Sequence, residues 1–240
     1  MDETKKNLLL TGASGGIGRA IIPVLAEAGY NLYLQAYRQA EALMEFLKEK
    51  RIDAVVVRQS LRTADDVREM REKIAEPIQV LVANAGISRS APAHKMNESD
   101  WQETLDVNLS VPFYLAQTFF PEMRAAGFGR VIFISSVVGA TLVRGTAAYA
   151  ASKAGLMGLA RALAADWSAF GITVNCVAPG YMDTGMIEQI PENILPLFRD
   201  KSVQGRLGPA EEIGYAVAYL ASEKSSFITG QTLHINGGII

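Results

Sequence analysis

The 240-residue sequence predicts an α/β fold, in which a parallel sheet of about seven strands is covered by helices on both faces. Short apolar runs alternate along the chain with stretches of helical periodicity, and a cluster of glycines follows the first apolar run. Apolar runs without polar alternation are typical of parallel strands that are buried on both faces. Because no repeat or low-complexity linker interrupts the alternation, residues 1–240 are predicted to form a single domain.

Seven apolar runs are predicted as strands, at residues 7–10, 32–34, 54–57, 78–83, 130–135, 172–177 and 232–235. Helical periodicity places helices between them, at about 17–28, 39–50, 64–75, 99–127 and 148–169, with another beginning at Pro209. The spacing of a capping box, in Thr63 with Asp66 and in Ser99 with Gln102, marks the start of two of these helices.

The composition excludes several classes of function. Lys and Arg number 23 against 25 Asp and Glu, a net charge of −2, so the chain has no overall positive field and nucleic-acid binding is not expected. Cys176 is the single cysteine, and neither His94 nor His234 has a ligand-like neighbour, so no disulfide and no metal site are predicted. The longest apolar-rich runs, of about 13 residues, are too short to span a membrane, and no signal peptide is recognised. A cytoplasmic protein without membrane contact is expected.

Two irregular segments, residues 86–97 and 180–205, follow the predicted fourth and sixth strands. They therefore lie at the carboxyl edge of the parallel sheet, where ligands of open α/β sheets bind. Residues 181–205 are predicted to cover a substrate, although a surface helix packed on the domain explains the same pattern equally well. The apolar residues of this segment are Met182, Met186, Ile187, Ile190, Leu195, Leu197 and Phe198.

A glycine-rich turn at residues 11–18, Thr-Gly-Ala-Ser-Gly-Gly-Ile-Gly, joins the first predicted strand to the first helix. Glycine lets the backbone approach a pyrophosphate closely, and the helix N-terminus offers free N–H groups with a partial positive charge. A glycine-rich turn alone could be a plain connection, but the strand–turn–helix context favours a dinucleotide site. The residues predicted to contact the cofactor here are Gly12, Ser14, Gly16, Ile17 and Gly18.

The spacing of these glycines resembles the short-chain dehydrogenase/reductase family, whose fold is a Rossmann-type doubly wound sheet with three α/β/α layers. The resemblance covers essentially the whole chain. It places a catalytic tetrad at Asn108, Ser136, Tyr149 and Lys153. It also implies cofactor contacts at Asn84, Ala85, Gly86, Tyr149, Lys153, Pro179, Gly180, Met182 and Thr184.

The cofactor implied by this resemblance is NADPH, with NAD less favoured. The end of the second strand, residues 35–39, has no carboxylate for a ribose hydroxyl, and it offers Arg38 for a 2′-phosphate. Two positions depart from the family pattern. Gly15 stands where many NADP-using relatives have a basic residue, and Ser60, followed by Leu61, replaces the usual Asp near the adenine.

The chemistry follows from one predicted helix. Tyr149 and Lys153 are four residues apart, so they share a helix face, and the ammonium is expected to lower the pKa of the tyrosine. Tyr149 then exchanges a proton with a carbonyl or alcohol oxygen, which Ser136 holds by a hydrogen bond. Pro112 provides no N–H for the Asn108 carbonyl, so a break in the helix is predicted near residues 108–112. The alternative explanation of Pro112 is a kink that serves only the packing of the helix.

Within the family, residues 136–139, 171–175, 205–208 and 229–238 resemble the subgroup that reduces 3-oxoacyl thioesters of acyl carrier protein in fatty acid synthesis. The resemblance implies a homotetramer and carrier docking near Arg130. Phe170 replaces a second basic residue of the subgroup, for which Arg89, Lys95, Arg124 or Arg144 could compensate. The alternatives are a reductase of a diffusible ketone or alcohol and, less favoured, a non-catalytic dinucleotide-binding regulator.

Overall fold

The computed structural model describes residues 5–185, 187 and 191–239. Its sheet has seven strands: β1 (Asn7–Leu10), β2 (Asn31–Ala36), β3 (Ala54–Arg58), β4 (Val80–Ala83), β5 (Gly129–Ile134), β6 (Ile172–Pro179) and β7 (Thr232–Ile235). All neighbouring pairs are parallel, in the order β3-β2-β1-β4-β5-β6-β7. The predicted fold class is confirmed.

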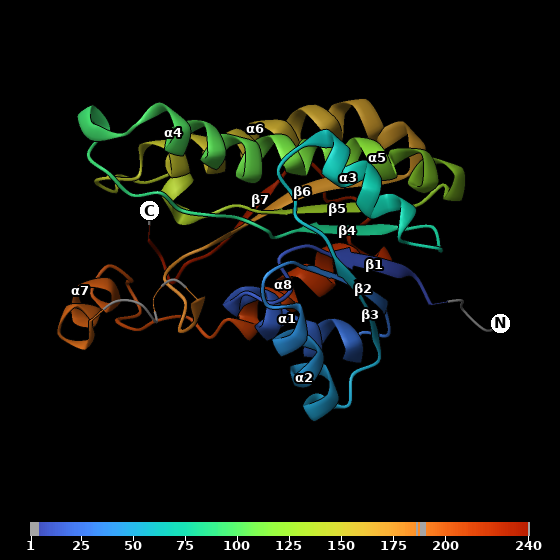
Figure 1. Ribbon diagram of the computed structural model, residues 1–240, viewed down its shortest axis with the longest axis horizontal. Coiled ribbons are helices and arrows are strands. Elements are labelled where there is room, and N and C mark those ends of the chain that lie inside the picture. Colours follow the sequence, from blue (N-terminus) through green and yellow to red (C-terminus); the bar gives the residue numbers. More distant parts are fainter. Residues whose placement is uncertain (1–4, 186, 188–190, 240) are drawn as a thin grey trace.

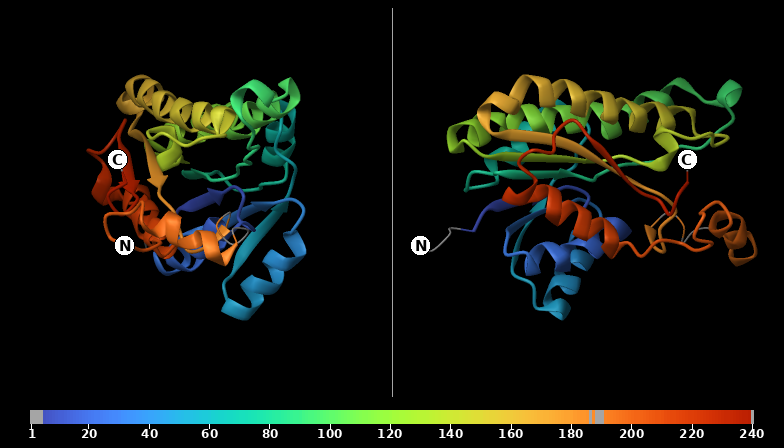
Figure 2. Two further views of the ribbon diagram at one scale, coloured as in Figure 1. Left: turned by 90° about the vertical axis from the view of Figure 1, so that its left-hand side faces the viewer. Right: turned by 180° about the vertical axis from the view of Figure 1, so that it is seen from behind.

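The helices form a layer on each side of this sheet (Figures 1 and 2). They are α1 (Gly16–Glu27), α2 (Ala40–Lys50), α3 (Ala64–Glu72), α4 (Glu98–Leu105), α5 (Val111–Ala126), α6 (Ala147–Trp167), α7 (Leu195–Arg199) and α8 (Glu211–Ala221). Helices α3 to α6 cover one face, and α1, α2 and α8 cover the other, whereas α7 lies beyond the carboxyl edge. No helix in the described part of the chain is long and apolar enough to cross a membrane.

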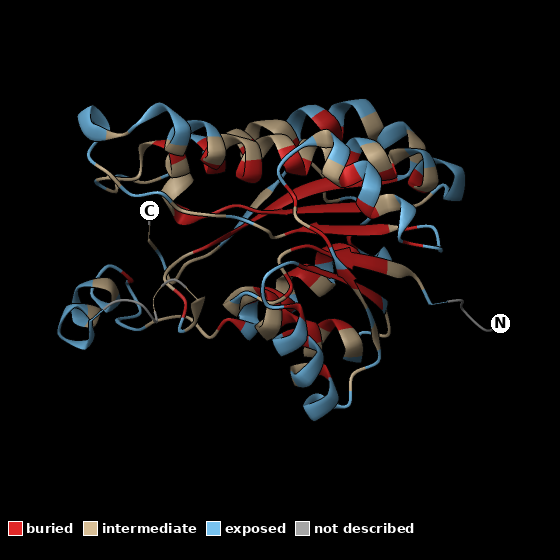
Figure 3. Cartoon of the chain, in the orientation of Figure 1, coloured by how far each residue is buried: buried red, intermediate tan, exposed pale blue. Residues whose placement is uncertain are grey.

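Two hydrophobic clusters fill the space between the layers. One joins alternate strand residues such as Leu9, Leu81 and Phe133 to α3, α5 and α6, and the other joins Leu8 and Leu10 to α1, α2 and α8. The central strands are therefore buried on both faces, as the red strands of Figure 3 show. This double burial is the physical reason why their sequences are unbroken apolar runs.

Local signals determine where the helices begin. The capping box of α3 is confirmed, since the side chain of Thr63 accepts from Asp66 N and that of Asp66 accepts from Thr63 N. The cap predicted at Ser99 is wrong, because α4 begins one residue before it. Asn97 is the N-cap, and its side chain accepts from the N–H of Asp100 at 2.7 Å.

The predicted break near residues 108–112 is present. A π-helical turn, Asp106–Ser110, separates α4 from α5, and the N–H of Val111 donates to the carbonyl of Asp106. Pro112 then lies in the first turn of α5, where its missing N–H costs little. The turn places Asn108 at the centre of the irregular segment, where its side chain is fully buried. π-Helical turns of this kind are frequent at functional sites.

Candidate active site

The candidate site lies where the strand order reverses, between β1 and β4. At this switch point the connections after the two strands turn to opposite faces of the sheet, and a crevice opens outside their carboxyl ends. The glycine turn follows β1, and Asn84, Ala85 and Gly86 follow β4. Two segments about 70 residues apart in sequence thus meet at one edge of the sheet.

The glycine turn is shaped for close backbone contact. Gly12 has φ +63°, and a Cβ there would lie 2.7 Å from Ala85 Cα. A Cβ on Gly18 would lie 2.4 Å from the Gly12 carbonyl oxygen. Helix α1 begins at Gly16 with no side-chain cap from Gly15, so the first N–H groups of the helix are available to an anion. The turn therefore fits a pyrophosphate.

Two polar residues hold this turn against the loop after β4. Asn84 Nδ2 donates to the carbonyls of Thr11 and Gly12, at 3.0 and 3.1 Å. Thr11 Oγ1 accepts from the N–H groups of Asn84 and Ala85, both at 3.1 Å. Asn84 was predicted as a cofactor contact, and in this structure its side chain fastens the turn. Thr11, which is fully buried, was missed as a functional position because a threonine beside a glycine motif gives no separate signal.

The segment after β6 closes over the glycine turn from the other side. A Cβ on Gly16 would lie 2.5 Å from Gly185 N and 2.6 Å from Thr184 Oγ1. Gly180 is equally crowded, because a Cβ there would lie 2.7 Å from Asn236 Cα. Gly16 and Thr184, two residues predicted to contact the cofactor, are thus brought into close contact.

The segment at residues 181–205, which is predicted to cover a substrate, is held to the rest of the fold near its start. Met182 is 5% exposed and forms a bridge with Gly208, and Pro179 ends the buried strand β6. Tyr181 packs edge-on against Phe198 at 4.9 Å, and Lys201 Nζ donates to the Tyr181 hydroxyl at 3.2 Å. Met186 and Ile190, which were predicted to contribute apolar surface here, lie outside the described residues. Leu195, Leu197 and Phe198 belong to α7, and Leu197 is 64% exposed.

Three members of the predicted tetrad meet at the end of β5. Ser136 follows this strand and shares a side-chain hydrogen bond with Tyr149 of α6. Lys153 lies one turn further along α6, with Nζ 5.6 Å from the centroid of the Tyr149 ring. Ser135, which directly follows β5, donates to the Lys153 carbonyl at 2.8 Å and so ties α6 to the sheet.

The predicted lowering of the tyrosine pKa by Lys153 is wrong for this structure. Burial raises the pKa of Tyr149 above its ordinary value, and only the hydrogen bond with Ser136 opposes the rise. The reason is the position of Lys153 Nζ, which donates to the carbonyl of Ile134 at 2.7 Å. Burial lowers the pKa of Lys153 itself to about 8. The lysine is therefore ready to give up a proton only slightly above neutral pH.

Asn108, the fourth member, acts on the loop after β4. Its Oδ1 accepts from Ile87 N at 2.8 Å, and its Nδ2 donates to the Ile87 carbonyl at 2.9 Å and to Ser152 Oγ at 3.1 Å. Ser152 in turn donates to the Tyr149 carbonyl at 2.8 Å. One buried amide therefore links the segment at residues 86–97 to α6, the helix that carries Tyr149 and Lys153. Ser152 was not predicted, since its chemistry emerges only when α4, α5 and α6 pack together.

The residues predicted for the adenosine end of the cofactor lie at the ends of β2 and β3. Arg38 is exposed just beyond β2, beside Tyr37, which is 50% exposed. Ser60 is half-buried just beyond β3, and Leu61 is buried. Because β2 and β3 are neighbours in the sheet, these positions border a common edge. A guanidinium that faces solvent here is accessible to a phosphate.

Arg130 does not occupy the exposed position that carrier docking requires, which corrects the prediction for this side chain. It is 3% exposed, and its guanidinium donates to the carbonyls of Ser222, Gly129 and Gly171 at 3.1, 2.8 and 3.3 Å. The ring of Phe128 covers it at 4.1 Å. Burial lowers the pKa of Arg130, as expected for a cation that is removed from water inside the fold.

Phe170, unlike Arg130, lies beside a cation that is exposed at the surface. The exposed guanidinium of Arg124 lies 4.7 Å from the centroid of the Phe170 ring. A cation is thus present at the surface where the predicted second basic residue is missing. Stacking on an aromatic ring holds the guanidinium in place without burying its charge.

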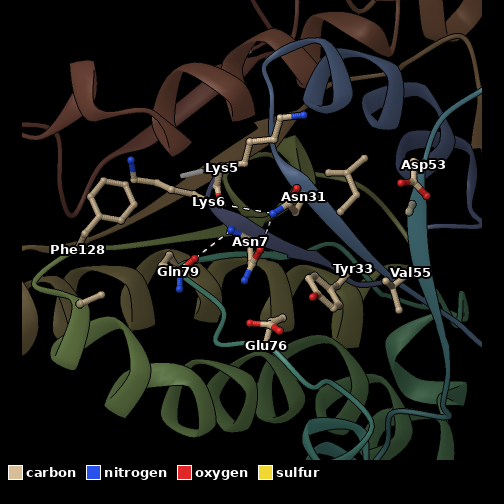
Figure 4. Close-up of a pocket in the computed structure, with 13 residues that line it drawn as sticks. Lys5, Lys6, Asn7, Asn31, Tyr33, Asp53, Val55, Glu76, Gln79 and Phe128 are labelled. Carbon is tan, nitrogen blue, oxygen red and sulfur yellow. Dashed lines mark hydrogen bonds between the residues drawn. The ribbon is translucent and has the colours of Figure 1, made fainter. Parts of the chain in front are cut away.

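A cavity of about 750 Å³ lies at the opposite, amino edge of the sheet (Figure 4). Its lining residues include Lys5, Lys6, Asn31, Asp53 and Glu76, and none of the tetrad. Asn31 Nδ2 donates to Asn7 Oδ1 at 3.0 Å, and Gln79 accepts from Asn7 N at 2.9 Å. These polar groups satisfy one another, and the cavity brings no two catalytic groups together.

Comparison with known proteins gives a consistent set of relatives. Residues 12–240 match a family model described as enoyl-(acyl carrier protein) reductase. A 3-oxoacyl-[acyl-carrier-protein] reductase of Staphylococcus aureus is 39% identical over 98% of each chain. A solved 3-oxoacyl-[acyl-carrier protein] reductase of Brucella melitensis has TM-score 0.92 at 29% identity, over 98% of this chain and 91% of its own.

A second solved relative is named for a different substrate. It is a putative NAD(P)-dependent gluconate 5-dehydrogenase of Beutenbergia cavernae with bound NADP, and it has TM-score 0.91 at 32% identity. The match covers 97% of this chain and 96% of that one. The shared architecture therefore serves both acyl thioesters and sugar acids among these relatives, so the fold alone does not determine the substrate.

Proposed function

Because the chain belongs to the short-chain dehydrogenase/reductase family, we propose that it reduces a 3-oxoacyl thioester to the 3-hydroxyacyl thioester with NADPH, in fatty acid or related acyl-chain synthesis. One observation carries the proposal: Ser136, Tyr149 and Lys153 meet at the carboxyl edge, beside the glycine turn. The full-length likeness to the S. aureus 3-oxoacyl reductase supports the substrate class.

In this proposal the cofactor binds along the glycine turn. A Cβ at Gly12 would collide with Ala85 and a Cβ at Gly16 with Gly185, so glycine at these positions lets the loops after β4 and β6 approach the turn closely. The pyrophosphate would bind the N-terminus of α1, the nicotinamide end would lie near Tyr149, Lys153 and Met182, and the adenosine would lie near Ser60. Arg38 favours a 2′-phosphate, hence NADPH over NADH.

The protein's own part of the reaction is proton transfer. Ser136 holds the ketone oxygen by a hydrogen bond, and Tyr149 gives its hydroxyl proton to that oxygen as the carbonyl becomes an alcohol. When bound, NADPH supplies the hydride that the ketone carbon receives. Burial raises the pKa of Tyr149, so the hydroxyl remains protonated at neutral pH and is ready to donate. Lys153, buried behind the tyrosine, returns a proton to it after the transfer.

The substrate enters, in this proposal, beneath the segment at residues 181–205 of a single-domain chain. The apolar side chains of that segment suit an acyl chain. If the acyl group is carried by an acidic carrier protein, its docking surface includes Arg124, which lies exposed on Phe170. The proposal includes a cytoplasmic location and a homotetramer, and sedimentation of the purified protein tests the tetramer.

The proposal is tested by following NADPH oxidation with acetoacetyl thioesters of coenzyme A and of acyl carrier protein, beside 5-ketogluconate and simple ketones. We expect turnover with both thioesters, and faster turnover with NADPH than with NADH. The sugar-acid relative makes 5-ketogluconate the informative competitor. Turnover of this ketone without turnover of any thioester would assign the chain to the second candidate function, a reductase of diffusible ketones.

The proposed docking of a carrier protein at Arg124 is tested separately. Arg124→Ala is expected to raise KM for the carrier-linked substrate and to leave KM for the coenzyme A thioester unchanged. An equal effect on both substrates would show that Arg124 does not act through the carrier.

A further inference from the structure

Strand β2 carries a polar residue where its neighbours are apolar. Gln35 is 4% exposed, between Leu34 and Ala36, which are also buried. A buried amide lowers stability unless its donor and its acceptor are both bonded, since each unbonded group loses its water without replacement. A glutamine at this position therefore needs a reason other than packing.

Both ends of the Gln35 side chain bond to backbone groups of other segments. Its Oε1 accepts from the N–H of Gly12 at 2.8 Å, and its Nε2 donates to the carbonyl of Gln59 at 2.6 Å. Its own carbonyl accepts from the N–H of Ala13 at 2.9 Å. One residue thus receives two successive N–H groups of the glycine turn and also bonds the chain just before Ser60.

The hydrogen bond between Gly12 and Gln35 determines the direction in which the Gly12 N–H points. Gly12 has φ +63°, and its N–H is directed into the sheet onto Gln35, while its carbonyl accepts from Gly15 N at 3.1 Å and from Asn84. An apolar side chain at position 35 would leave the Gly12 N–H without this partner. The turn would then lose one of its contacts with the sheet, while the backbone bond from Ala13 N to the Gln35 carbonyl remains.

The bond to Gln59 extends the same link to the end of β3. The N–H of Gln59 donates to the Ala36 carbonyl at 3.1 Å, and its side chain accepts from Lys73 Nζ at 2.5 Å. Gln59 is 7% exposed, so this junction is also inside the fold. Gln35 therefore stands between the two places where a dinucleotide is expected to bind, the glycine turn and the position of Ser60.

We infer that Gln35 is a positioning residue for the dinucleotide, because its two amide bonds fix the separation between the pyrophosphate-binding turn and the adenine-binding loop. It touches neither substrate nor the reacting atoms and acts through Gly12 and Gln59. The inference rests on the proposed function, since it requires a nicotinamide dinucleotide at the glycine turn. It explains why a costly polar group is retained inside β2.

The test compares Gln35→Leu and the length-matched Gln35→Met with wild type. We expect the Kd and KM for NADPH to rise about tenfold, because a turn without this bond must be ordered when the cofactor binds, at a cost of the order of one hydrogen bond. The kcat at saturating NADPH and the KM for the thioester should stay within about twofold, because the tetrad is untouched. A purely structural role would lower Tm without this separation of KM from kcat.

The matched control is Gln79→Leu. Gln79 also bonds backbone at both ends, to Asn7 N at 2.9 Å and to the Pro77 carbonyl at 3.1 Å, but at the amino edge. We expect a lower Tm with unchanged NADPH affinity. Equal NADPH affinities in wild type and both Gln35 variants, or equal losses in the Gln35 and Gln79 variants, would overturn the inference. A wild type that binds no dinucleotide would instead overturn the proposed function.

Discussion

The two edges of the same sheet differ in the polar side chains that they bury. At the carboxyl edge, Asn108, Ser136 and Lys153 are each at most 9% exposed and are bonded to backbone or to one another. At the amino edge, Lys6 lines the cavity and pairs with Glu223, with side chains that are 30% and 67% exposed, whereas the buried Arg130 bonds only to backbone carbonyls. Buried polar groups are costly, so the cluster of buried polar residues at the carboxyl edge locates the candidate chemistry better than the volume of a cavity does.

Among the variants of Lys153, Arg38 and Lys6, the largest effect is expected at Lys153. Lys153→Met removes the buried ammonium and its bond to the Ile134 carbonyl, so kcat should fall by at least about a hundredfold. The wild-type kcat for ketone reduction should decline above about pH 8, the pKa to which burial lowers Lys153. A pH profile of kcat measures both. A wild-type rate that stays constant up to pH 10 would show that this proton is not used.

The same group gives a stability prediction with a definite sign. Its folded pKa of about 8 lies below the ordinary value of 10.5, so between these pH values the unfolded chain binds the extra proton. The contribution of Lys153 to the free energy of unfolding should therefore rise with pH from about 8 to 10.5. Denaturant unfolding of wild type and Lys153→Met should show a difference that changes in this window. A difference independent of pH would contradict the lowered pKa.

A smaller effect is expected where the carboxyl edge meets solvent. Arg38→Leu removes an exposed guanidinium from the end of β2, so KM for NADPH should rise about tenfold while KM for NADH is unchanged. The ratio of the two cofactors' kcat/KM values measures this preference. An equal loss with both cofactors would mean that Arg38 does not bind the 2′-phosphate.

The smallest effect is expected at the amino edge. Lys6→Met breaks the exposed pair with Glu223, and such pairs add little to stability because water and salt screen them. We predict that kcat, KM and Tm all remain at wild-type values. A loss of activity here would remove the distinction between the edges.

The sequence was sufficient for the fold because the central strands are buried on both faces. Their apolar runs, such as 78–83 and 172–177, overlap β4 and β6. The break at Pro112 was also predictable, since a missing N–H has a local consequence. The start of α4 was not, because Asn97 and Ser99 are both good caps and only the folded chain selects one.

The site residues were harder to predict from the sequence wherever their properties depend on the surrounding folded structure. Arg130 has a sequence position that suggests docking, but burial under Phe128 and three carbonyl acceptors are products of packing. The pKa of Tyr149 depends on burial more than on the spacing to Lys153. Gln35 carries no motif at all, and its role emerges only when β1, β2 and β3 lie side by side.

The central claim is that the buried groups at the carboxyl edge perform proton transfer to a ketone oxygen. Tyr149→Phe tests it most directly, because it removes one hydroxyl and its bond with Ser136 while keeping the ring. NADPH-dependent reduction of an acetoacetyl thioester should lose at least about a thousandfold in kcat, with the Kd for NADPH unchanged. A kcat within about tenfold of wild type would contradict the account.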